Sequence, residues 1–125
     1  MTKEFQASKP IYIQIADHLS SQIVRGEIKP GEKLPSVREM AIVSGVNPNT
    51  VQRTYSEMER MGIVETKRGQ GTFVIQNEEI VDSLKTQLQR EIIDRFVQSM
   101  RGLGLSEEDI TEGLKQYLRG EQDGR

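Results

Sequence analysis

The sequence contains no cysteine and no tryptophan, and His18 is its single histidine among 125 residues. Without cysteine there is neither a disulfide framework nor a thiolate metal site, and one histidine cannot form a metal-binding pair. No stretch approaches the roughly 18 consecutive apolar residues of a membrane-spanning helix, and no apolar secretory run follows the N-terminus. These absences predict a cytoplasmic protein that needs no cofactor and is not an enzyme.

The charge is small in total and unevenly distributed. The chain has a formal net charge of -2, but residues 1–76 carry 10 basic and 8 acidic side chains, and residues 77–125 carry 7 and 11. The first segment is therefore at +2 and the second at -4. Because the affinity for phosphate depends on local cations, the acidic total does not exclude a nucleic-acid partner. The asymmetry predicts two functional segments, 1–76 and 77–125.

Two helices are predicted before residue 46. Apolar residues recur at every fourth position from Ile11, which predicts a helix that ends near Gly26. A second helix begins at a capping box, in which Ser36 accepts a hydrogen bond from the backbone of Glu39 and the Glu39 side chain reaches back to Ser36. Gly45 ends it, because glycine readily adopts the left-handed conformation of a tight turn.

A third helix is predicted to begin sharply after that turn. Asn47 is a good N-cap and Pro48 is a favoured first helical residue. No acidic residue precedes Glu57 in this helix, although a solvated helix surface normally alternates acidic and basic side chains. A helix N-terminus with polar and cationic side chains suits an anionic partner. The inward face is predicted to hold Val51, Tyr55, Met58 and Met61, and the outward face Asn49, Gln52, Arg53, Ser56 and Arg60.

A hairpin is predicted directly after the third helix. Residues 63–67 and 72–75 form two short apolar runs, joined by Arg68, Gly69, Gln70 and Gly71. The glycines permit a tight turn with positive φ. Since isolated hairpins are marginal in water, this one must pack on the helices, with a short strand near Leu34 as a third member.

The second segment carries a long apolar stripe at nearly helical spacing. A helix of about two dozen residues would be roughly 36 Å long, which is too long to lie wholly on so small a core. The stripe therefore favours a dimer seam, although an intramolecular core is the alternative. A last helix begins at the capping signal Ser106. The predicted seam residues are Leu84, Leu88, Ile92, Phe96 and Met100.

Residues 10–75 resemble the winged helix-turn-helix domain of the GntR family of bacterial transcription regulators. Three motifs carry the resemblance, and the short helical tail is similar to the YtrA-type subgroup, whose members lack the large effector-binding domain typical of the family. The implied fold class is mainly α with a small β-wing: a winged helix-turn-helix domain followed by a short α-helical dimerisation tail. The motifs are Leu34-Pro35-Ser36-x-Arg38-Glu39, Asn49-Thr50-Val51 and Arg68-Gly69-x-Gly71-Thr72-Phe73-Val74.

The resemblance also implies a role for individual residues. Arg38 would contact a phosphate, and Arg68 with Gly69 would place the wing tip in or beside the minor groove. Many relatives carry Arg where Gln52 stands, so their base preference does not transfer to this chain. For all of these side chains a solvated surface is the alternative, and for Asn47 the cap alone is sufficient. The residues expected at the major groove are Asn47, Asn49, Thr50, Gln52 and Arg53.

Together these features predict a homodimeric, sequence-specific transcription regulator. Its partners would be double-stranded DNA with a pseudo-palindromic operator and a second copy of the chain, with no membrane involved, and it would act as a repressor. No motif identifies a small-molecule effector. The alternative is a winged-helix protein-interaction module that docks a larger complex through its long C-terminal helix.

Overall fold

The computed structural model describes residues 8–122, with side-chain burial for residues 8–120. The fold is mainly α with one two-stranded sheet, as the sequence predicts. The chain divides into two compact units, Met1–Thr86 and Gln87–Arg125, and the division falls within α4. The elements are α1 (Ile11–Val24), α2 (Val37–Ser44), α3 (Pro48–Arg60), β1 (Val64–Lys67), β2 (Gly71–Val74), α4 (Glu78–Gly102) and α5 (Glu107–Gln122).

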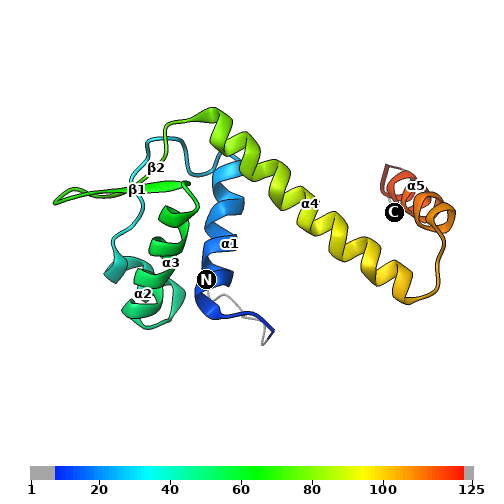
Figure 1. Ribbon diagram of the computed structural model, residues 1–125, viewed down its shortest axis with the longest axis horizontal. Helices are drawn as coiled ribbons and strands as arrows, with labels where there is room; N and C mark the ends of the chain where they lie inside the picture. The colour runs from blue at the N-terminus through cyan, green and yellow to red at the C-terminus, as the bar shows by residue number, and fades with distance from the viewer. Residues whose placement is uncertain (1–7, 123–125) are drawn as a thin grey trace. The chain divides into compact units, whose positions relative to one another are not determined.

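The core of the first unit is built around α3. This helix contacts α1, α2 and β1, and in Figure 1 it lies between α1 and α2 with the β1–β2 hairpin extending beyond them. Val51 and Met58 are fully buried and Tyr55 is nearly so, which confirms the predicted inward face. Met61 is the exception at 37% exposed, because the helix ends at Arg60 and Met61 is its C-cap.

Two buried polar groups fix α3 against its neighbours. The Thr54 hydroxyl, which is fully buried, lies 3.1 Å from the carbonyl oxygen of Tyr12 in α1 and can donate to it. The Tyr55 hydroxyl donates to the carbonyl oxygen of Pro35 at 2.7 Å. Burial raises the pKa of Tyr55 to about 12, and the nearby Glu39 carboxylate acts in the same direction. The phenol is therefore a neutral hydrogen-bond donor that holds α3 to the start of α2.

The helix-turn-helix has the predicted caps. Ser36 and Glu39 form both hydrogen bonds of the capping box, at 2.9 and 3.1 Å. Gly45 follows α2 in the left-handed region with φ 69°, and Asn47 caps α3. The turn between α2 and α3 is therefore short and its geometry is set by local chemistry.

The wing is a two-stranded antiparallel hairpin with a reduced third member. Val64 pairs with Val74 and Lys67 with Gly71. The predicted strand near Leu34 is a single bridge, Lys33 to Phe73, because Pro35 has no N–H to extend a ladder. The Lys33 side chain lies against Gly71, where an added Cβ would be 2.7 Å from Lys33 Cε. Gly71, with φ 124°, thus lets the two segments approach.

The second unit contains the C-terminal part of α4 and the whole of α5. The connection turns at Gly104, with φ 81°, and α5 begins at a second capping box made by Ser106 and Asp109. Ile110 is the only buried residue between positions 87 and 120. The unit therefore has very little core of its own within one chain.

Candidate nucleic-acid interface

The N-terminal half of α3 presents polar side chains to solvent. Asn49, Gln52 and Arg53 are exposed, and the first turn contains no acidic residue. The side chains of Asn49 and Gln52 form no hydrogen bond with any other residue of the described range. Thr50 is half-buried. This helix end thus offers free amide groups and a positive dipole end to an anion.

Asn47 has a structural task in the same turn. Its side-chain oxygen accepts a hydrogen bond from the backbone N–H of Asn49 at 2.7 Å. The side chain is exposed, and its amide NH₂ group remains able to donate. The cap uses one of the two lone pairs of the Asn47 side-chain oxygen, and the amide nitrogen remains free to contact DNA.

Arg38 lies in the first turn of α2. It is exposed and forms no ion pair with a residue between positions 8 and 122. Its neighbour Glu39 is engaged by Ser36, whose backbone N–H and side-chain hydrogen bonds lower the pKa of the Glu39 carboxyl. A cation at a helix N-terminus opposes the dipole. Arg38 is therefore poorly compensated within the described chain, which favours an external anion.

The wing tip also carries a cation without an ion pair among the described residues. Arg68 and Gly69 are exposed in the turn between β1 and β2, and Gly69 has φ 77°. Arg68 forms no hydrogen bond or ion pair with a described residue, whereas Lys67 lies over the ring of Phe73 at 4.8 Å and 3.9 Å from a Glu65 oxygen. The arginine at the tip is thus available to a ligand, and the adjacent lysine is held along the strand.

Arg53 has a partner that the sequence did not indicate. Its guanidinium carbon lies 4.0 Å from the ring centroid of Tyr12 in α1. Helical periodicity shows that Arg53 points outward, but it cannot show which side chain of another helix lies beside it. Arg60, also predicted outward, is bound to Glu57 through Nε and Nη2. The exposed face of α3 is therefore partly organised by neighbouring side chains.

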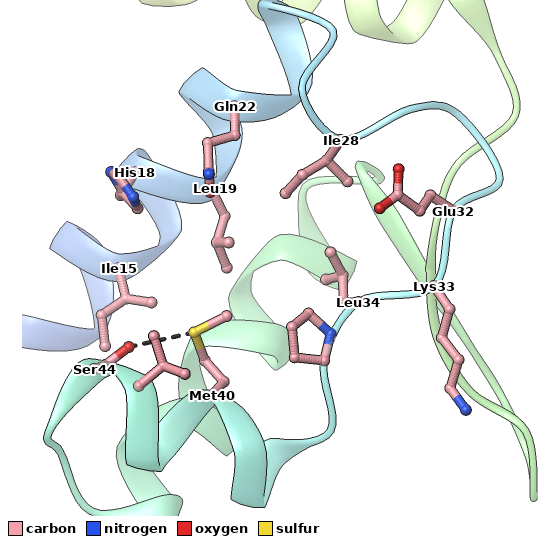
Figure 2. A pocket seen from close by; sticks show the side chains of 12 residues that line it. Ile15, His18, Leu19, Gln22, Ile28, Glu32, Lys33, Leu34, Met40 and Ser44 are labelled. Atoms are coloured by element: carbon pink, nitrogen blue, oxygen red, sulfur yellow. Dashed lines mark hydrogen bonds between the residues drawn. The ribbon is translucent and has the colours of Figure 1, made fainter. Parts of the chain in front are cut away.

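A cavity of about 370 Å³ opens on another part of the first unit (Figure 2). Its volume is in the range of small-molecule sites, roughly 300–1,000 Å³. The wall includes a hydrogen bond from Ser44 Oγ to Met40 Sδ at 3.3 Å. None of the predicted DNA contacts lines it. The cavity is lined by Ile15, His18, Leu19 and Gln22 of α1, by Ile28, Glu32, Lys33, Leu34 and Pro35 of the segment between α1 and α2, and by Met40, Val43 and Ser44 of α2.

The predicted seam residues differ in exposure. Leu84 belongs to the first unit and is only 4% exposed, so its side chain is already covered within one chain. Leu88 and Met100 are half-buried, whereas Ile92 is 58% and Phe96 36% exposed. The second unit also exposes further large apolar side chains, which are Ile93, Leu103, Leu114, Tyr117 and Leu118.

Between residues 8 and 122, no helix combines the length and the apolar composition that a membrane span requires. No group of three or more His, Asp or Glu side chains between residues 8 and 122 is placed to hold a metal ion.

Proteins similar in sequence to this chain are bacterial transcription regulators. Residues 11–74 match the bacterial regulatory proteins of the gntR family. The chain is 60% identical to the HTH-type transcriptional regulator YhcF of Bacillus subtilis (strain 168), over 96% of this chain and 99% of that protein. It is 38% identical to the HTH-type transcriptional repressor YtrA of the same organism, over 96% and 93%.

Solved structures show the same similarity. A GntR family transcriptional regulator from Listeria monocytogenes has a TM-score of 0.82 and 37% identity, over 90% of this chain and 98% of that one. The DNA-binding domain of AraR in complex with operator ORX1 has a TM-score of 0.54 and 27% identity, over 59% and 94%. The first similarity extends over both units.

Proposed function

We propose that this chain, which belongs to the gntR family of bacterial regulatory proteins, is a homodimeric repressor that binds a pseudo-palindromic operator in the cytoplasm. Membership of the family makes it a DNA-binding transcription regulator of the YtrA type and not an enzyme. Repression is supported by the relative named as the repressor YtrA. Family membership also favours DNA binding over the alternative of a protein-docking module.

The observation that carries the DNA-binding part of the proposal is the exposed polar face of α3. Asn49 and Gln52 have the amide groups that can bridge N6 and N7 of an adenine, and neither side chain is engaged within the described chain. We place this face in the major groove. Asn47, Thr50 and Arg53 lie in the same turns, Arg38 contacts a phosphate, and Arg68 with Gly69 enters or flanks the minor groove.

The observation that supports the dimer is the uncovered apolar surface of residues 87–120. Ile92 and Phe96 are exposed on α4, and Leu88 and Met100 are half-buried beside them. Exposed apolar side chains in such number mark an interaction surface. We assign the seam to these four residues, whereas Leu84 belongs to the core of the first unit. Two copies joined in this way would read two half-sites, as the symmetry of a dimer requires.

The test of base reading is the substitution Asn49→Ala in the full chain. We expect it to weaken binding to an operator, selected from random DNA, by about 1–3 kcal/mol, and to change binding to a scrambled duplex little. Gln98→Ala is the matched control, because Gln98 is an exposed side chain of the second unit. Equal losses on both duplexes would remove Asn49 from base reading.

The test of the seam is the substitution Ile92→Glu. A carboxylate buried in an apolar interface without a partner costs about 2 kcal/mol or more, so sedimentation should show dissociation to monomers at concentrations where the unmodified chain is dimeric. Gln98→Glu adds the same charge at an exposed position of α4 and should leave the dimer intact. A dimer that tolerates Ile92→Glu would place the seam elsewhere.

A further inference from the structure

The contact between Tyr12 and Arg53 joins α3 to the start of α1. The guanidinium carbon of Arg53 lies 4.0 Å from the centroid of the Tyr12 ring, well within the roughly 6 Å of a cation–π interaction. Tyr12 is half-buried in the first turn of α1, and Arg53 is exposed on α3. The ring therefore provides a fixed platform for a side chain that would otherwise move freely in solvent.

The backbone of Tyr12 is anchored independently of its ring. The hydroxyl of Thr54, the residue after Arg53, lies 3.1 Å from the Tyr12 carbonyl oxygen and 3.0 Å from the Thr50 carbonyl oxygen, so its single proton can be donated to either. Thr54 is fully buried. A substitution at position 12 that changes only the ring leaves this hydrogen bond possible. The platform can thus be removed while α1 and α3 stay joined.

The charges around Arg53 leave its hydrogen-bond donors available. Glu57 is the nearby acid on α3, and its pKa is lowered first by the hydrogen bond from Arg60 and also by the charges of Arg60 and Arg53. Arg60 therefore occupies the Glu57 carboxylate. The N–H groups of Arg53 donate to no other residue in the range 8–122. Because stacking uses the face of the guanidinium, the donors along its edge can still bind an oxygen ligand.

We propose that Tyr12 is a positioning residue for DNA binding, and that it holds Arg53 on the α1 side of α3 to bind a backbone phosphate. Asn49 and Gln52 are then left to read the bases. The side chains of Arg53 and Thr54 both contact Tyr12, so this side of α3 faces α1. A side chain that is held in place before binding loses less conformational entropy when it meets its ligand. The inference rests on the proposed placement of α3 in the major groove.

The experiment measures binding of the full chain to the selected operator and to a scrambled duplex of equal length, at several salt concentrations. Tyr12→Leu removes the aromatic face and should weaken binding to both duplexes about 2- to 5-fold, the size expected for an exposed cation–π contact. Tyr12→Phe keeps the face and should restore binding. Arg53→Ala should lower the salt slope by about one.

The decisive comparison is the double variant. Tyr12→Leu should cause no further loss when Arg53 is already Ala, because the platform then has nothing to hold. An equal loss in both backgrounds would overturn the positioning role, and a loss confined to the operator would overturn the phosphate contact. If the Asn49→Ala variant keeps full discrimination between the duplexes, Asn49 does not read bases and the proposed function fails at that residue, while the comparison at Tyr12 still decides the positioning role.

A second measurement does not depend on the folding of the Tyr12→Leu variant. In the free full-length protein, the ring current of an aromatic platform shifts the side-chain protons of Arg53 upfield in an NMR spectrum. We expect this shift in the unmodified chain and in Tyr12→Phe. Arg53 protons at the position of a freely solvated arginine in both proteins would show that the stack does not form in solution, and would overturn the proposal.

Discussion

In the described part of the chain, 14 of the 15 buried apolar residues lie in the unit of residues 1–86, and Ile110 alone lies in the unit of residues 87–125. The second unit instead exposes seven large apolar side chains, among them Ile92, Leu103 and Tyr117. Both units contain well-capped helices. Well-formed helices are therefore not sufficient for an independently stable domain, because the burial of apolar surface supplies the dominant stabilising term. The first unit buries this surface within one chain, whereas the second leaves most of it exposed.

The largest expected effect concerns the core of the first unit. Met58→Ala removes a fully buried side chain of α3 and should lower the free energy of unfolding by about 2–5 kcal/mol. Met61→Ala, at the C-cap of the same helix, is the control and should change it much less because Met61 is already 37% exposed. Urea denaturation of both variants measures the effect. Similar losses for the two methionines would contradict a core centred on α3.

Removing residues 76–86, which end at the boundary between the two units, should have a smaller effect on the free energy of unfolding. A fragment of residues 1–86 retains Leu84, which is 4% exposed, and should fold as a monomer. A fragment of residues 1–75 lacks Leu84 and should be less stable by about 1.5–3 kcal/mol, the value for burying such a side chain. Denaturation and sedimentation of the two fragments would test this. A dimeric fragment 1–86 would show that the first unit contains the seam, contrary to the proposal.

The smallest effect is expected from removing two equivalent caps, one in each unit. Ser36→Ala and Ser106→Ala each remove an N-cap and should cost about 0.5–2 kcal/mol. We expect Ser36→Ala to lower the unfolding free energy of the first unit. Ser106→Ala should act mainly on the proposed dimer, because α5 has little packing within one chain. The free energy of unfolding of the first unit measures the effect of Ser36→Ala. Sedimentation of the full chain measures the effect of Ser106→Ala on dimerisation.

The same caps predict a dependence on pH. Hydrogen bonds from Ser36 and Ser106 lower the pKa of Glu39 and of Asp109 from 4.5 and 3.8. A lowered pKa in the folded state means that the stabilisation is complete above these ordinary values and is lost as the pH falls through the lower folded values. The free energies of unfolding of Glu39→Ala and Asp109→Ala should therefore differ from that of the unmodified chain at pH 7 and approach it below about pH 4, where the carboxyl groups are protonated. A constant difference would exclude the carboxylates as the cause.

Much of the helix-turn-helix could be predicted because its signals are local. The capping box of Ser36 and Glu39, the turn at Gly45 and the start of α3 at Asn47 depend on residues within a few positions of one another. Helical periodicity likewise placed Val51 and Met58 inside and Asn49 outside. Met61 was misplaced because periodicity continues along the sequence after the helix has ended.

The order of the elements, the N-caps of α2, α3 and α5, and the residues that α3 turns outward could therefore be predicted from the sequence alone. Only the tertiary structure decided that Tyr12 lies beneath Arg53, that Leu84 is covered within the first unit, and that the strand near Leu34 is a single bridge. The physical reason is the range of the interactions. Caps and periodicity act within one or two helical turns, whereas stacking and burial depend on which distant segments the folded chain brings together.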